Sequence, residues 1–206
     1  MEITLNQIGK RFNFNWIFKG VSVQIRANEP WVILGSNGSG KSTFLSILAG
    51  ASIPSDGEIQ WKLNNSIVEE TSIYQYVSIA APYLELIEEF TLQEHLNFHF
   101  SVKPLIQGVS KKDLLGIVGL EKAADRRISY FSSGMRQRLK LALAILSDTD
   151  VLLLDEPLSN LDNKAATWYA DLIKQFGKDR VIVVCSNHQQ EEYAFCKHSL
   201  SIEDFR

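Results

Sequence analysis

The feature that most constrains this chain is the run Gly35-Ser36-Asn37-Gly38-Ser39-Gly40-Lys41-Ser42, which matches the pattern G-x-x-x-x-G-K-[ST] in full. An apolar segment, Trp31–Leu34, precedes the run, and a segment compatible with a helix, Thr43–Ala49, follows it. A loop of this pattern between a strand and a helix is typical of sites for the phosphates of a nucleoside triphosphate. The sequence therefore predicts an α/β chain with a phosphate-binding loop.

The residue types in this loop suit phosphate for physical reasons. Glycines allow a tight bend in which successive N–H groups point inward around an anion. The helix that begins near Lys41 adds the positive end of its dipole. We expect Lys41 to reach the β- and γ-phosphates and the Ser42 hydroxyl to take one Mg²⁺ position. The predicted nucleotide-binding residues of the loop are Gly35, Ser36, Asn37, Gly38, Ser39, Gly40, Lys41, Ser42 and Thr43.

Composition narrows the class of protein further. The 206 residues are 45% hydrophobic and 22% charged, which predicts one globular domain with a sizeable core. The net charge of −3 and the lack of a lysine run argue against nucleic acid as a partner. Two scattered cysteines, Cys185 and Cys196, fit a reducing compartment. No apolar run approaches the length of a membrane span, so we expect the chain not to cross a membrane by itself.

The order of predicted elements indicates a mostly parallel sheet that is covered on both faces. The first thirty residues favour an antiparallel β region, and a helical subdomain at about 84–146 is inserted before the last strands. We expect a single domain over residues 1–206. The expected strands are Glu58–Leu63, Tyr74–Ile79, Val151–Leu154 and Val181–Cys185. The expected helices are Thr91–Phe100, Ser110–Val118, a helix capped by Ser132 or Ser133 through Leu146, and Lys164–Phe176.

Two acids follow one of the buried strands. Asp155 and Glu156 come directly after the apolar run Val151–Leu154. The carboxyl ends of parallel strands border the ligand crevice of such a sheet. We therefore predict that Asp155 holds Mg²⁺ together with Ser42, and that Glu156 polarises a water for attack on the γ-phosphate.

Three further segments carry a resemblance to a known family. The run Phe131-Ser132-Ser133-Gly134-Met135 resembles the signature of the ATP-binding cassette (ABC) family, which usually reads L-S-G-G-Q. The run Ser159-Asn160-Leu161-Asp162 resembles the D-loop of the family, and His188 resembles its switch histidine. The ordered set of motifs extends over essentially the whole chain, from the Phe12 region to the strand near Ile202.

The resemblance implies an ATPase that works as a head-to-tail pair of cassettes. ATP would lie between the phosphate loop of one cassette and Ser132, Ser133 and Gly134 of the other. His188 would sense the γ-phosphate and keep Glu156 and the water in line, so the implied catalytic residues are Glu156, His188 and Lys41. Phe12 occupies the place of the aromatic that stacks on adenine, with Trp16 as a rival and a core position as the alternative.

The leading hypothesis is the ATP-hydrolysing subunit of an ABC transporter. Its expected cofactors are ATP and Mg²⁺. The expected partners are a second cassette, most simply an identical copy, and a separate membrane permease that would hold the chain at the inner face of the membrane. The segment Tyr83–Phe90 is either the groove for that permease or a core face. The alternatives are a soluble ABC ATPase of translation or DNA maintenance, and a regulatory module with slow hydrolysis.

Several positions depart from the family pattern or admit another interpretation. Ala80 stands where the family carries a glutamine, Ser133 replaces the first signature glycine and Met135 replaces the signature glutamine. These changes put the rate of hydrolysis in doubt more than ATP binding.

His95 and His99 share one face of a predicted helix, and we favour a pair that faces solvent or a partner over a metal site.

Overall fold

The computed structural model describes residues 1–206 and contains two β-sheets. The first is a four-stranded antiparallel sheet in the order β2 (Asn15–Arg26), β1 (Glu2–Phe12), β4 (Asp56–Leu63), β5 (Ser66–Val68). The second is a five-stranded parallel sheet in the order β6 (Val77–Ala80), β7 (Val151–Asp155), β8 (Val181–Ser186), β3 (Trp31–Leu34), β9 (His198–Ser201). This arrangement confirms the predicted fold class.

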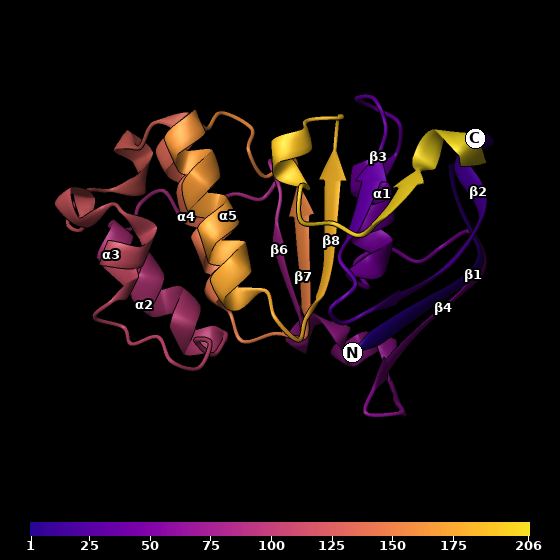
Figure 1. Ribbon diagram of the computed structural model, residues 1–206, viewed down its shortest axis with the longest axis horizontal. Helices are drawn as coiled ribbons and strands as arrows, with labels where there is room; N and C mark the ends of the chain where they lie inside the picture. Colours follow the sequence, from indigo (N-terminus) through magenta and orange to yellow (C-terminus); the bar gives the residue numbers. More distant parts are fainter.

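Helices separate and cover the sheets. The helix α1 lies between the two sheets, and the helices α2 to α5 gather on the opposite side of the parallel sheet (Figure 1). The α-helices are α1 (Lys41–Leu48), α2 (Leu92–Val102), α3 (Leu114–Val118), α4 (Ser133–Leu146) and α5 (Asn163–Phe176). Short 3₁₀ helices span Glu70–Gln75, Glu121–Ala123, Ile128–Tyr130, Gln190–Glu192 and Ile202–Phe205. None of the helices combines the length and the apolar character that a membrane span requires.

The central strands β7 and β8 are apolar up to their last residue, and both of their faces are buried. Side chains alternate across a strand, so neighbouring residues of β7 enter different cores. Leu153 belongs to the cluster that contains Phe44 of α1, whereas Leu152 belongs to the cluster that contains Leu139 of α4. Two hydrophobic cores therefore fix the parallel sheet between α1 and the helical side of the molecule. Cys185 of β8 is fully buried, as its apolar neighbours predict.

Local capping signals set most helix ends. The Thr91 hydroxyl accepts a hydrogen bond from the Glu94 N–H at 3.2 Å, and the Glu94 carboxylate accepts one from the Thr91 N–H at 2.8 Å. This reciprocal capping box begins α2 at the position where the sequence predicts a helix start. Ser132 caps α4 by accepting from the Met135 N–H at 3.2 Å. The helix predicted at Lys164 is capped by Asp162 in the same way.

Two predicted elements are wrong in part. The strand predicted from Tyr74 begins only at Val77, because the preceding residues form a 3₁₀ helix, and Gln75 lies in that helix rather than on a strand. The helix predicted from Ser110 begins only at Leu114. The Ser110 hydroxyl donates to the Asp113 carboxylate at 2.5 Å, so it closes a turn before the helix instead of capping it.

The contribution of the α2 capping box to stability can be tested by substitution of Thr91. We expect Thr91→Ala to lower the free energy of unfolding by about 1 kcal/mol, because the substitution leaves the Glu94 N–H without its side-chain partner. For a domain of this size the midpoint of thermal unfolding falls by about 2–4 °C. Thermal unfolding followed by circular dichroism measures the shift. The exposed Thr71 supplies the control, since Thr71→Ala removes no cap; equal shifts for the two variants contradict the assignment.

Candidate nucleotide-binding site

The phosphate loop connects β3 to α1, at the carboxyl edge of the parallel sheet. Gly38 and Gly40 adopt the left-handed backbone angles φ 77° and φ 105°. A β-carbon on Gly40 would lie 2.4 Å from the Ile17 side chain of β2, so this turn tolerates only glycine. The close approach of β2 makes one wall of the site.

A polar cavity of about 290 Å³ lies over this loop. Most of its lining comes from the predicted phosphate loop, and the predicted catalytic acid Glu156 adds a carboxylate to it. Its only apolar contribution comes from β2. The lining residues are Ile17, Asn37, Gly38, Gly40, Lys41, Ser42, Thr43 and Glu156. The structure thus brings the loop and the strand-end acid together around one space.

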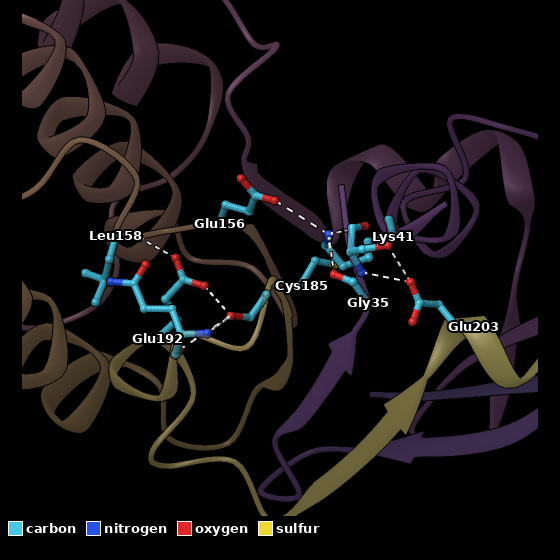
Figure 2. Close-up of polar contacts among 10 residues, drawn as sticks. Gly35, Lys41, Glu156, Leu158, Cys185, Glu192 and Glu203 are labelled. Carbon is cyan, nitrogen blue, oxygen red and sulfur yellow. Dashed lines mark hydrogen bonds and ion pairs between the residues drawn. The ribbon is translucent and has the colours of Figure 1, made fainter. Parts of the chain in front are cut away.

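Lys41 is the central charge of the cavity. Its side chain is only 4% exposed, and its Nζ donates to the carbonyl oxygens of Gly35 at 2.9 Å and Ser36 at 3.1 Å. The same Nζ lies 3.6 Å from Oε1 of Glu156 (Figure 2). These partners satisfy a buried ammonium that would otherwise be costly to remove from water. A phosphate that enters the cavity therefore meets a cation already oriented toward the loop.

Asp155 and Ser42 form the second polar pair of the site. Asp155 is 2% exposed at the end of β7; burial raises the pKa of its carboxyl, and the neighbouring Ser42 hydroxyl partly opposes that shift. Both groups offer oxygen atoms, which are the ligands that Mg²⁺ prefers. No group of three or more His, Cys, Asp or Glu side chains is placed to bind a metal. The pair therefore fits a cation whose remaining ligands are water and phosphate oxygens.

Two predicted catalytic residues adopt strained backbone angles. Glu156 has φ 46° and His188 has φ 61°, in the left-handed region that non-glycine residues seldom occupy. They follow the ends of β7 and β8, which pair so that Asp155 lies opposite Cys185. The Glu156 N–H donates to the Cys185 carbonyl at 2.9 Å, which ties the two strand ends together. Neighbouring strands thus present both residues at the same edge of the sheet.

The signature residues lie outside the cavity. Ser132, Ser133 and Gly134 begin α4, and none of them lines the space over the phosphate loop. A β-carbon on Gly134 would lie 3.1 Å from the Asn160 carbonyl, so this helix start packs on the D-loop segment. Within one chain, the signature and the phosphate loop therefore make no common site.

The aromatic residues proposed for adenine differ in accessibility. Phe12 is 55% exposed, so it is not a core aromatic, and the Lys10 Nζ lies 5.4 Å from its ring centroid. Trp16 is 37% exposed and is approached by Arg11 and Lys19, whose charges lie 5.5 and 4.6 Å from its ring. Phe12 has the more accessible ring, and its role toward adenine stays a prediction.

Three residues of the site carry no motif that sequence analysis could detect. Ile17 lines the cavity, and Glu203 accepts hydrogen bonds from the Ser36 N–H at 3.1 Å and the Ser36 hydroxyl at 2.5 Å. Glu192 is buried beneath the segment that follows Glu156 (Figure 2). Ile17 and Glu203 lie far from Lys41 in the sequence, so only the folded chain reveals these contacts.

A larger groove opens between the parallel sheet and the helical subdomain. It measures about 450 Å³ and is mainly apolar, with Lys103, Lys140 and Glu85 as its charged groups. Leu84 and Leu86, from the predicted docking segment, are partly buried in its wall. Ala80 lies in this groove at the end of β6 and not in the nucleotide cavity.

Of the two alternatives for the histidine pair, a face toward open solvent is wrong, and a face toward a partner stays a prediction. His95 is 6% exposed and His99 shares a hydrogen bond of 2.9 Å with the Ser147 hydroxyl, so neither simply faces solvent. Both rings line the inner wall of the larger groove. Burial lowers the pKa of both imidazoles, that of His99 to about 4, with the neighbouring His95 adding to the effect. Near neutral pH the two rings are therefore uncharged.

This combination of a parallel sheet, a glycine-rich loop before α1 and an acid at the end of β7 defines a P-loop nucleoside triphosphatase. The sequence model of the family described as "ABC transporter" matches residues 18–159. The chain therefore belongs to the ABC transporter family, as a nucleotide-binding subunit that binds and hydrolyses ATP.

Curated relatives agree with this assignment. The "Uncharacterized ABC transporter ATP-binding protein YybJ" of Bacillus subtilis is 27% identical over 205 residues, which are 99% of this chain and 94% of that protein. The "Nod factor export ATP-binding protein I" of Burkholderia lata is 29% identical, over 99% of this chain and 68% of the relative. The "Spermidine/putrescine import ATP-binding protein PotA" of Pseudomonas fluorescens is 34% identical, over 84% of this chain and 49% of the relative.

Solved structures share the fold. A putative ABC transporter ATP-binding protein from Pyrococcus furiosus superposes with a TM-score of 0.82 at 16% identity, over 100% of this chain and 99% of the other. The dimeric structure of MJ0796, described as a bacterial ABC transporter cassette, gives a TM-score of 0.80 at 24% identity, over 98% and 95% of the two chains. The arrangement of two sheets around α1 is thus common to these cassettes.

The buried histidine pair generates a pH prediction. The pKa of His99 is about 4 in the folded chain and 6.5 for an unperturbed imidazole, so the unfolded chain binds more protons between these values. The stabilisation from neutral His99 is therefore complete above pH 6.5 and is lost as the pH falls toward 4. We expect His99→Gln, which keeps a partner for Ser147, to flatten the fall in unfolding temperature over this range. The exposed His198, changed to Gln, is the control; identical curves for His99→Gln and the parent contradict the prediction.

Proposed function

We propose that this chain powers an ABC transporter by ATP-driven, head-to-tail dimerisation and by contact with a separate membrane permease. The proposal rests on one observation: the residues predicted to bind the nucleotide lie on two separate surfaces of the chain. The phosphate loop and Glu156 share one cavity, whereas Ser132, Ser133 and Gly134 begin a helix outside it. A second cassette that presents its own signature to this cavity completes the site.

The resident charges support ATP binding and hydrolysis in this cavity. The γ-phosphate replaces the Gly35 and Ser36 carbonyls as the partner of Lys41, because an ammonium pairs more strongly with a phosphate anion than with neutral carbonyls. Release of Lys41 from Glu156 leaves that carboxylate free to accept a proton from the attacking water. Ser42 and Asp155 would hold Mg²⁺, which would neutralise charge on the phosphate oxygens.

Residues in three further places have predicted roles in ATP binding and hydrolysis. His188, at the end of β8, hydrogen-bonds the γ-phosphate and keeps Glu156 and the water in line. Phe12 offers an accessible ring for stacking on adenine. Ser132 and the N–H of Gly134, at the start of α4, contact the γ-phosphate from the partner cassette. Residues 1–206 act as one nucleotide-binding domain, with the helical subdomain at about 84–146.

The names of the relatives support the proposed partners. They are described as ATP-binding proteins of transport systems, and MJ0796 was solved as a dimer. We propose a homodimer of this chain, held by two equivalent ATP molecules, on the cytoplasmic side of a permease. The relatives include an export protein and an import protein, so they do not select a direction of transport.

The larger groove is the proposed contact with the permease. Its floor is formed by β6 and α4, and its rim carries Leu84 and Leu86. A groove of this kind accepts the apolar face of a short helix, and Lys103 and Lys140 complement acidic residues on that helix. Because β6 belongs to the same sheet as the catalytic strand β7, movement at the groove reaches the nucleotide site through paired strands.

The role of Glu156 is tested by Glu156→Gln. We expect ATP hydrolysis to fall at least a hundredfold and an ATP-bound dimer to accumulate, because the amide binds no proton from the water while the loop still holds ATP. Phosphate release and size-exclusion chromatography with light scattering, with and without Mg-ATP, measure the two effects.

Matched variants separate catalysis from binding. The exposed Glu191, changed to Gln, removes one carboxylate outside the cavity and leaves turnover unchanged. Lys41→Ala removes the phosphate contact, and it abolishes both turnover and the dimer. Turnover by Glu156→Gln at the rate of the parent would falsify the catalytic assignment.

The docking groove is tested in cells by the double variant Leu84→Asp and Leu86→Asp. We expect the membrane-bound fraction of the chain to fall severalfold, because charged side chains then line an apolar contact surface. ATP-dependent dimerisation of the purified variant stays unchanged. Ile67→Asp, at a 63% exposed position on β5, is the control that leaves membrane association intact. Equal membrane fractions for all three proteins contradict this use of the groove.

A further inference from the structure

Glu192 is a buried acid that the proposed chemistry leaves without a role. It ends the 3₁₀ helix Gln190–Glu192 and is 2% exposed. Its Oε1 accepts a hydrogen bond from the Leu158 N–H at 3.1 Å, and its Oε2 accepts one from the Ser186 hydroxyl at 2.5 Å (Figure 2). One carboxylate therefore joins two segments that are distant in the sequence.

The two segments are those that carry the predicted catalytic residues. Leu158 follows Glu156 by two positions, and Ser186 precedes His188 by two positions. Glu156 and His188 both have left-handed backbone angles, φ 46° and φ 61°. Such angles persist only where surrounding contacts determine the backbone more strongly than its own preference does. The Glu192 carboxylate supplies contacts of this kind to both segments at once.

The turn that carries Glu192 is itself fixed. The hydroxyl of Tyr169, a fully buried residue of α5, donates to the backbone carbonyl of Glu192 at 3.0 Å. The Leu158 side chain is also buried, at 3% exposure. Without the carboxylate, the Leu158 N–H would lose its partner, and a buried amide left without a hydrogen bond is strongly unfavourable. Tyr169 therefore fixes the backbone of Glu192, and the buried Leu158 N–H depends on the Glu192 carboxylate for its hydrogen bond.

The same link reaches the signature helix. Gln137 of α4 donates to the Pro157 carbonyl at 2.9 Å, and Gly134 packs against the Asn160 carbonyl. The segment 157–160 therefore lies between the start of α4 on one side and Glu192 on the other. A displacement of this segment changes the placement of Glu156 and of the surface that would face a partner cassette.

We propose that Glu192 is a positioning residue for ATP hydrolysis, which holds the Glu156 and His188 segments as one unit. The proposal rests on the proposed function, because it takes Glu156 and His188 as the groups that act on the γ-phosphate and the water. The Glu192 carboxylate has its hydrogen-bonding partners outside the loop Gly35–Thr43, so it positions the catalytic groups without taking part in nucleotide binding.

The proposal predicts a change in kcat with little change in KM. We expect Glu192→Ala to lower kcat for ATP by about tenfold to a hundredfold, which is the effect of a misplacement of about 1 Å at a catalytic group. The KM for ATP stays within about twofold, since the phosphate loop is untouched. Glu192→Gln keeps an acceptor for the Leu158 N–H and recovers most of kcat. Steady-state phosphate release by the purified full chain measures these values.

Two controls isolate the link. Glu191→Ala removes the neighbouring exposed acid of the same turn and leaves kcat unchanged. Ser186→Ala removes the second hydrogen-bonding partner of Glu192 and lowers kcat in the same direction as Glu192→Ala. The double variant, Ser186→Ala with Glu192→Ala, is no slower than Glu192→Ala alone, because the interaction is already lost. If Glu192→Ala does not fold, Ser186→Ala and Glu192→Gln decide the outcome.

Hydrogen exchange provides a readout that does not need turnover. We expect the amides of residues 157–161 and 186–189 to exchange faster in Glu192→Ala, while those of α1 keep their protection. Unchanged exchange in both segments, or an unchanged kcat in Glu192→Ala and Ser186→Ala, overturns the proposal. A parent chain without turnover, or full turnover by Glu156→Gln, instead contradicts the proposed function, and the exchange measurement still tests the link.

Discussion

The nucleotide site depends on the pairing of β8 with β3 on one side and with β7 on the other. In this register Leu34 lies opposite Ser186, and Asp155 lies opposite Cys185. The carboxyl ends of three strands therefore share one edge, where the phosphate loop, Glu156 and His188 follow. Both faces of these strands are buried, so a slip in register would move apolar side chains between two cores and is strongly opposed.

Charge balance at this edge explains how the cavity can keep a buried cation before any phosphate is present. Lys41 is paired with two carbonyls and lies near Glu156, so it is satisfied before a nucleotide arrives. In the proposed function, an incoming phosphate offers Lys41 a stronger partner, and this exchange would free Glu156. Glu192 makes a separate contact near the same edge, where its carboxylate accepts a hydrogen bond from the segment that follows Glu156.

Features that depend on residues close together in the sequence are predicted better than features that depend on distant residues. The capping box at Thr91 and the cap at Ser132 can be predicted correctly, because both depend on residues three positions apart. The start of α3 is harder to place, since Ser110 and Asp113 satisfy each other in a turn that has the same spacing as a cap. The burial of His99 escapes prediction because nothing in one helix reports what the rest of the chain places over it.

Local spacing and apolar periodicity are enough to specify the strand–loop–helix that binds phosphate, the acids at the end of β7 and the alternating order of strands and helices. The three-dimensional packing of the chain is needed to establish that Ile17 forms a wall of the cavity and that Glu203 secures Ser36. The same packing lets Glu192 join the segment after β7 to the end of β8. Such contacts arise between distant segments, and a single acidic residue carries no signal of the partner that folding will bring to it.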